Sequence, residues 1–123
     1  MNFLLVDDAK VLRIYLKNSI NEFRHNPKDV FYEAGDGEDA LKQLKIHEID
    51  FIFLDLNMPL MNGIDVMKVI RKDEKYKDIS VVILSGDGNK KTILDAINAG
   101  ATDYLVKPPD KERIKEILNK IKE

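Results

Sequence analysis

Six polar side chains follow short apolar runs in this chain of 123 residues, each near the point where a run ends. In chain order they are Asp7, Asp8, Asp55, Asn57, Ser85 and Lys107. Three carboxylates brought close together repel each other, and some take up protons unless a cation balances their charge. The candidate ligands are all oxygens, and the chain has no Cys. This set favours Mg²⁺, which takes one or two carboxylates plus a phosphate oxygen, with Mn²⁺ as a substitute.

Asp55 ends the apolar run 51–54, and a strand that ends on an acid holds the carboxylate on a rigid part of the fold. Carboxylates are known phosphoryl acceptors, through aspartyl phosphate intermediates. A metal beside such a carboxylate neutralises the incoming phosphoryl oxygens. Lys107 is expected to neutralise another oxygen, and Ser85 to donate a hydrogen bond to a third. We therefore predict phosphoryl transfer to Asp55, with the three carboxylates holding the metal ion.

Each of these residues also has an ordinary structural explanation. Asp7 and Asp8 alone are equally well explained by a helix N-cap and its solvated neighbour. Asp55 alone fits a cap of the next loop, Ser85 a turn, and Lys107 a surface charge. What favours a functional site is that these residues follow different predicted strands and converge on one edge.

Five apolar runs of strand length alternate with helical patterns along the chain. The runs cover residues 2–6, 30–34, 51–54, 81–84 and 102–106. Several are nearly continuous, which is typical of strands buried on both faces of a parallel sheet. Between them, apolar residues recur at a spacing of three to four, as in amphipathic helices. Asp36 and Asp110 are expected to cap two of these helices, Gly63 to open one, and Gly100 to end one.

A regular alternation of strands and helices predicts an α/β fold, a doubly wound parallel sheet with helices on both faces. Right-handed crossovers leave few topologies for five strands. We expect the flavodoxin-like (βα)5 arrangement with strand order 2-1-3-4-5, in which ligands bind beyond the carboxyl ends of the strands. All six polar side chains would then lie at that edge.

The composition fits one globular domain, with 44% hydrophobic and 34% charged residues. The net charge of −2 argues against direct binding to nucleic acid, which usually needs a basic excess. No apolar run approaches the roughly 18 residues of a membrane span, and the start has no signal-peptide pattern. The lack of cysteine is compatible with the cytoplasmic location that we expect. His25 and His47 lie in polar surroundings and are expected on the surface.

Four segments of the chain resemble the receiver domains of two-component response regulators, in the form typical of chemotaxis regulators. They are LLVDDA (4–9), LDLNMPLMNG (54–63), ILSGD (83–87) and GATDYLVKP (100–108). Each segment alone is a weak signal, but their order and spacing together are highly specific. The resemblance covers nearly the whole chain, so we expect residues 1–123 to form one receiver domain.

The resemblance implies a role for each matching residue. Asp55 matches the phosphorylated aspartate, and Asp8 matches a direct metal ligand. Asp7 matches a ligand that acts through water, and Asn57 the residue whose backbone carbonyl completes the metal site. Ser85 matches the switch hydroxyl, and Tyr104 matches the switch aromatic that turns inward on activation. Lys107 matches the lysine of the family motif, and its peptide bond to Pro108 matches one that is typically cis.

The function implied is a signalling switch rather than a metabolic enzyme. A histidine kinase or a phosphotransfer protein would donate the phosphoryl group, and the domain would catalyse its own phosphorylation and dephosphorylation. Asn57 and Asp87 would flank the water that hydrolyses the phosphoryl group. A downstream target protein would bind the face around helix four, strand five and helix five. Two departures from the family pattern are Gly86, where Ala is common, and Pro109, where an apolar or aromatic residue is usual.

Four other functions share parts of this pattern. An FMN-binding flavodoxin would need a phosphate cradle after the first strand, where Asp7 and Asp8 would repel a phosphate. A phosphatase of the haloacid dehalogenase type carries a second Asp at the position of Asn57. A DNA-binding regulator would need an output domain beyond Glu123. A degenerate receiver that only scaffolds would lack catalytic residues, and here every catalytic position is filled.

Overall fold

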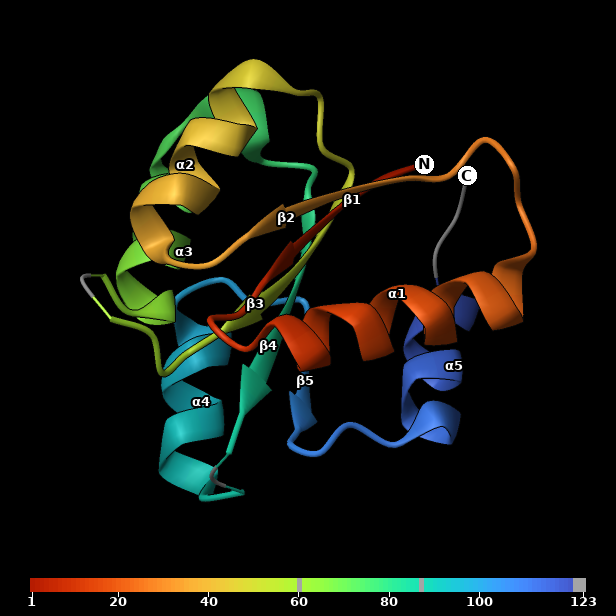
Figure 1. The fold of residues 1–123 in the computed structure, drawn as a ribbon. Helices are drawn as coiled ribbons and strands as arrows, with labels where there is room; N and C mark the ends of the chain where they lie inside the picture. Colours follow the sequence, from red (N-terminus) through yellow and green to blue (C-terminus); the bar gives the residue numbers. More distant parts are fainter. Residues whose placement is uncertain (60, 87, 121–123) are drawn as a thin grey trace.

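The chain forms a parallel β-sheet with helices on both faces (Figure 1). The structure is a computed structural model that describes residues 1–59, 61–86 and 88–120. The strands in these ranges pair in parallel in the order β2-β1-β3-β4-β5, which confirms the predicted topology. They are β1 (Asn2–Val6), β2 (Val30–Ala34), β3 (Phe51–Asp55), β4 (Ser80–Ser85) and β5 (Asp103–Val106).

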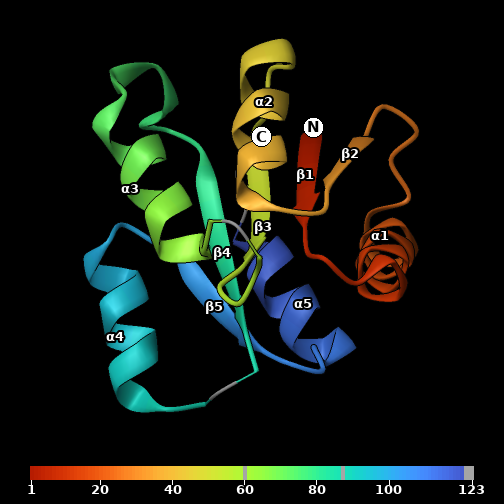
Figure 2. The same ribbon diagram turned by 60° about the vertical axis from the view of Figure 1, so that its left-hand side comes forward.

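The helices lie in two layers, with α1 and α5 on one face of the sheet and α2, α3 and α4 on the other (Figures 1 and 2). Their bounds are α1 (Lys10–Arg24), α2 (Gly37–Ile46), α3 (Gly63–Lys72), α4 (Lys90–Asn98) and α5 (Lys111–Asn119), with a short 3₁₀ helix η1 (Glu74–Tyr76) before β4. Within the described ranges, none of these helices has the length and apolar character needed to cross a bilayer.

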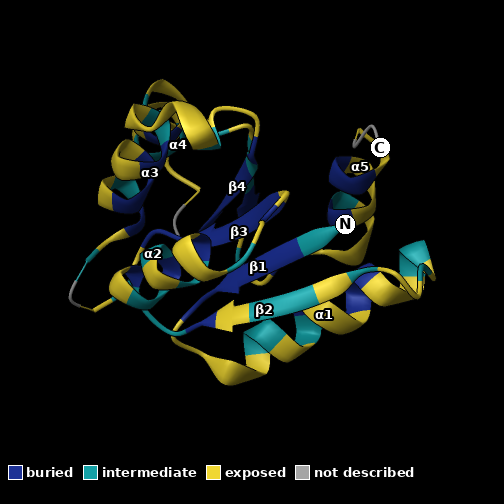
Figure 3. Cartoon of the chain, turned by 90° about the horizontal axis from the view of Figure 1, so that it is seen from above, coloured by how far each residue is buried: buried dark blue, intermediate teal, exposed yellow. Residues whose placement is uncertain are grey.

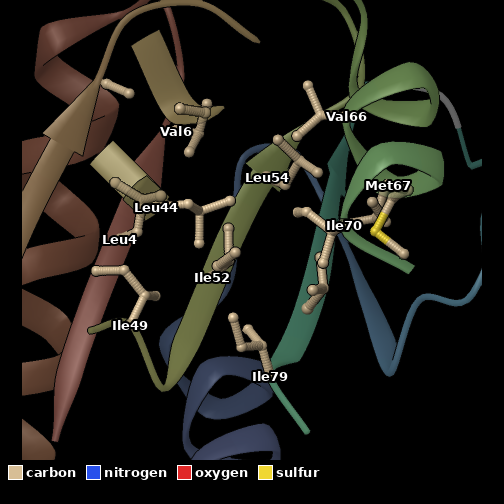
Figure 4. Close-up of a cluster of buried hydrophobic side chains, with 14 of the residues drawn as sticks. Leu4, Val6, Leu44, Ile49, Ile52, Leu54, Val66, Met67, Ile70 and Ile79 are labelled. Atoms are coloured by element: carbon tan, nitrogen blue, oxygen red, sulfur yellow. The ribbon is translucent and has the colours of Figure 1, made fainter. Parts of the chain in front are cut away.

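The strands are nearly continuous apolar runs because both faces of the sheet are covered. In β3, Ile52 and Leu54 point to the cluster under α2, α3 and α4, which Figure 4 shows in close-up. Phe51 and Phe53 alternate with them and join the cluster under α1 and α5. Figure 3 shows the result, with the central strands buried and exposed residues on the outer sides of the helices.

Several local predictions are confirmed. Asp36 accepts a hydrogen bond from the N–H of Asp39 at the start of α2, and Asp110 caps α5 in the same way. Gly63 opens α3, and Gly100 follows α4 with a φ of 110°. The strand bounds differ slightly from those predicted: Asp55 and Ser85 are the last residues of β3 and β4, and β5 begins at residue 103.

An ion-pair cluster around Asp29 joins the end of α1 to the start of β2. Arg24 Nε lies 2.6 Å from Asp29 Oδ2, and the ammonium group of Met1 lies 3.1 Å from Oδ1. Burial raises the pKa of Asp29, but the hydrogen bonds from Arg24 and the ammonium group outweigh it, so the pKa is lowered overall. The ionised carboxylate therefore stabilises the folded state.

We predict that Asp29→Asn lowers the free energy of unfolding by about 2 kcal/mol at pH 7, because Arg24 loses its charged partner. The folded-state pKa lies below the unfolded value of about 3.9, so this contribution is present above that pH and is lost as the pH falls through the folded-state pKa. Urea unfolding at several pH values measures it. The difference between wild type and Asp29→Asn should be full at pH 7 and shrink at acidic pH. The exposed Asp78→Asn is the control; an equal loss in both variants would contradict the prediction.

Candidate functional site

Three carboxylates meet at the carboxyl edge of the sheet, as the sequence predicts. Asp7 and Asp55 are 0% exposed, while Asp8 is exposed. One oxygen of each lies within 4.8 Å of the others. The register explains why: β1 and β3 are hydrogen-bonded neighbours with Val6 opposite Leu54, so the acids that follow them are adjacent.

Lys107 forms an ion pair with both buried carboxylates. Its Nζ lies 3.0 Å from Asp7 Oδ2 and 3.0 Å from Asp55 Oδ1. Its backbone N–H donates to the carbonyl of Ser85 at 2.7 Å, which attaches the start of the loop after β5 to β4. Burial lowers the pKa of Lys107, but the hydrogen bonds and charges of the two carboxylates outweigh burial and raise the pKa overall. Lys107 is therefore a stable cation at neutral pH.

The two oxygens of Asp55 have different surroundings. Oδ1 accepts a hydrogen bond from the N–H of Asn57 at 3.0 Å and faces Lys107. Oδ2 is buried and has no hydrogen-bond partner among the residues that the structure describes. Burial raises the pKa of Asp55, and the charge of Asp7 raises it further, while Lys107 and Asn57 act in the opposite direction. A buried carboxylate oxygen without a partner is costly, so this atom is suited to a ligand.

Asp7 is held by contacts at both of its carboxylate oxygens. Oδ1 accepts from the N–H of Ala9 at 2.8 Å, and Oδ2 faces Lys107. The guanidinium group of Arg13 donates to the backbone carbonyl of Asp7 and also pairs with Glu33 at 2.9 Å. The first residues of α1 therefore fix Asp7 in place.

The donor set fits a divalent cation such as Mg²⁺. Three carboxylates face one ammonium group, so a single cation from the protein stands against three potential negative charges. The oxygen donors of these three carboxylates match the preference of Mg²⁺ for carboxylates and water. Asp7, Asp8 and Asp55 are the residues that could hold the ion. Asn57 is exposed, and a metal-binding role for its carbonyl stays a prediction.

Ser85 and Tyr104 belong to the face of the sheet that α4 covers. Ser85 is 1% exposed and lies two residues beyond Ile83 on β4, so the two side chains share a face. Tyr104 is opposite Ile83 on β5 and packs half-buried against the same cluster. The guanidinium carbon of Arg113 lies 5.3 Å from the centre of the Tyr104 ring.

The peptide bond between Lys107 and Pro108 is cis, as predicted.

The two histidines lie away from the acidic cluster. His25 is exposed at the end of α1, and His47 stacks on Tyr32 with ring centres 3.8 Å apart. His47 follows α2 and precedes β3, so it lies toward the opposite edge of the sheet. Asp87 lies outside the described residues.

Sequence reasoning missed the packing role of Gly63. A Cβ atom there would lie 2.9 Å from the Cα of Leu56 and would overlap the carbonyl oxygen of Asp55. The first turn of α3 thus rests directly on the backbone that carries the acidic cluster. The only local signal was a glycine at a position where a better helix former would be favoured.

Comparisons with known proteins cover almost the entire chain. A family model described as response regulator receiver domain matches residues 3–119. Chemotaxis protein CheY-3 of Vibrio cholerae is 39% identical over 121 residues, which are 98% of this chain and 91% of that protein. A chemotaxis protein CheY homolog of Campylobacter jejuni is 33% identical over 122 residues, 98% of this chain and 92% of that protein. The solved structure of Vibrio cholerae chemotaxis protein CheY4 superposes with a TM-score of 0.85 at 26% identity, over 98% of both chains.

We predict that the acidic cluster binds Mg²⁺ and that Asp8→Asn weakens binding by roughly tenfold, because one of three carboxylate charges is lost. Isothermal titration calorimetry, or chemical shifts of backbone amides near Asp8 during a Mg²⁺ titration, measures the affinity. The matched control is Glu38→Gln, which removes an exposed acid in the first turn of α2. Equal affinity in wild type and Asp8→Asn would contradict this site.

Proposed function

The chain belongs to the response regulator receiver family of two-component signalling, and from this premise we propose that Asp55 is its phosphorylated residue. Mg²⁺ binding and phosphorylation of an aspartate are general features of the family. The observation that carries the assignment is Asp55 Oδ2, a buried carboxylate oxygen with no hydrogen-bond partner among the described residues. Oδ1 of the same carboxylate is held by Asn57 and Lys107, so Oδ2 is the oxygen left to act as a nucleophile.

In the proposed reaction, Asp55 Oδ2 attacks the phosphorus of the donor and forms a new P–O bond. The bond from phosphorus to the donor breaks, and its electron pair leaves with the imidazole of a phosphohistidine or, for acetyl phosphate, with acetate. Lys107 lies 3.0 Å from Asp55 Oδ1, where its charge would pair with a phosphoryl oxygen. Ser85 would donate a hydrogen bond to another oxygen. Mg²⁺ held by Asp7, Asp8, Asp55 and the Asn57 carbonyl would supply charge neutralisation.

The output of the reaction is a change of shape rather than a released product. Movement of Ser85 toward the phosphoryl group would open space for Tyr104, which packs on the same face of the sheet. This shifts a population between two conformations. The face that changes would be the one formed by α4, β5 and α5, where Leu94, Ile97 and Val106 are 56%, 44% and 39% exposed.

The partners follow from this role and stay predictions. A histidine kinase or phosphotransfer protein would supply the phosphoryl group, and a target protein would bind the α4, β5 and α5 face. We expect no direct binding to nucleic acid, a cytoplasmic location, and one receiver domain over residues 1–123. Phosphorylation and dephosphorylation are both ascribed to the domain's own residues.

We predict that incubation with acetyl phosphate and Mg²⁺ adds one phosphoryl group to the wild-type chain, measured as intact mass. Asp55→Asn should show no increase, because an amide is not a phosphoryl acceptor. Asp78→Asn removes an exposed carboxylate and should behave as wild type. An equal mass increase in Asp55→Asn would show that the phosphorylated residue lies elsewhere.

We further predict that Asn57→Ala is still phosphorylated but loses the phosphoryl group at a changed rate. Asn57 is exposed two residues beyond Asp55, where its side chain can contact an attacking water. After removal of the donor by desalting, the decay of the phosphorylated mass gives the half-life. The same measurement on Asp87→Ala tests the second residue. Half-lives equal to that of wild type in both variants would exclude this role.

A further inference from the structure

The loop that carries Lys107 has few backbone donors. Residues 107–110 connect β5 to α5, and two of them, Pro108 and Pro109, have no N–H. The N–H of Lys107 is bonded to Ser85 on β4, which fixes the start of the loop. Its far end is fixed by a side chain from α1: the hydroxyl of Tyr15 donates to the carbonyl of Pro109 at 2.8 Å. The two residues are 94 positions apart in the chain.

The same helix also fixes the acidic side of the site. Two residues before Tyr15, Arg13 donates from its guanidinium group to the carbonyl of Asp7. Helix α1 therefore bonds to both loops whose side chains meet in the Lys107–Asp7 ion pair, at a distance of 3.0 Å. Both bonds go to backbone carbonyls, so they set where the two loops lie and leave the reactive side chains unchanged.

We infer that Tyr15 is a positioning residue that sets the place of the Lys107 ammonium group relative to Asp55. The inference deepens the proposed function and rests on it, because it assumes that Lys107 stabilises the phosphoryl group transferred to Asp55. Small displacements of a catalytic group are costly: about 1 Å of misplacement can lower a rate by roughly a hundredfold. Loss of the Tyr15 hydroxyl frees the Pro109 carbonyl and lets the loop shift.

The alternative is that Tyr15 only contributes packing, since its ring lies against the cluster under α1 and α5. Tyr15→Phe separates the two roles, because phenylalanine keeps the ring and removes the donor. A matched control exists in the same chain. The hydroxyl of Tyr76 also donates to a backbone carbonyl, that of Leu44 at 3.4 Å, but Tyr76 lies in η1 before β4, toward the opposite edge of the sheet.

The test is the rate of phosphorylation by acetyl phosphate at saturating Mg²⁺, followed by intact mass. We expect Tyr15→Phe to lower the rate by roughly tenfold, and saturating Mg²⁺ ensures that a change in metal affinity does not affect the measured rate. Tyr76→Phe should react as wild type. In a Lys107→Ala background, Tyr15→Phe should cause no further loss, because its effect acts through Lys107.

Restoring a donor provides an independent readout. Replacement of Tyr15 by 4-aminophenylalanine keeps a donor at the same ring position and should recover most of the wild-type rate. If the 4-aminophenylalanine variant reacts as slowly as Tyr15→Phe, the inference is overturned. It is also overturned if Tyr15→Phe lowers the rate by the same factor in the Lys107→Ala background as in the wild type. A Tyr15→Phe rate equal to that of wild type overturns it as well. If wild type itself is not phosphorylated at Asp55, the proposed function fails, which is a separate result.

Discussion

The ion pair that Lys107 makes with two carboxylates is the interaction on which the site depends. Asp7 and Asp55 are completely buried, and a buried charge without a partner costs several kcal/mol. The Lys107 ammonium group lies 3.0 Å from both carboxylates and offsets part of the cost of burying them. Its single positive charge cannot balance the charges of Asp7, Asp55 and Asp8 together. The remaining negative charge is what a divalent cation neutralises. The site is therefore held together in part by Lys107 and left deficient in positive charge, as a metal-dependent acceptor of a phosphoryl group requires.

The fold brings these groups together through register and close backbone packing. Neighbouring parallel strands end at the same level, so side chains that follow β1 and β3 meet without any specific contact between loops. Gly63 then lets α3 start against the carbonyl of Asp55, where any side chain would force the two segments apart. At the other end of α3, Arg71 donates to the carbonyls of Gly100 and Ile79 and so joins this helix to the segments that flank β4 and α4. Rigid surroundings of this kind keep the acidic cluster in place before a ligand binds.

Local signals predicted the strands and helix ends, because these depend on short stretches of sequence. The strand order was predicted from the alternation of strands and helices, the crossover rule and the flavodoxin-like pattern. The cap at Asp36 and the helix end at Gly100 each need only a few residues, and both were predicted correctly. The clustering of Asp7, Asp8, Asp55 and Lys107 was also predicted, since it follows from the strand order. Individual side-chain hydrogen bonds between distant segments were not predicted. The bond from Tyr15 to Pro109 joins a helix to a loop 94 residues away, and no periodicity or motif points to it.

The two departures from the family pattern differ in their consequences. A Cβ atom at Gly86 would meet no atom within 4 Å among the described residues, so space does not require glycine there. What Gly86 changes is backbone freedom after β4, beside the hydroxyl of Ser85. Pro109 has the opposite effect: it is buried, its φ is restricted, and its carbonyl is bonded to Tyr15. In this receiver, the loop that carries Lys107 is therefore restrained by its own two prolines and by α1. Gly86, by contrast, allows the backbone after Ser85 conformations that the proposed movement of its hydroxyl would use.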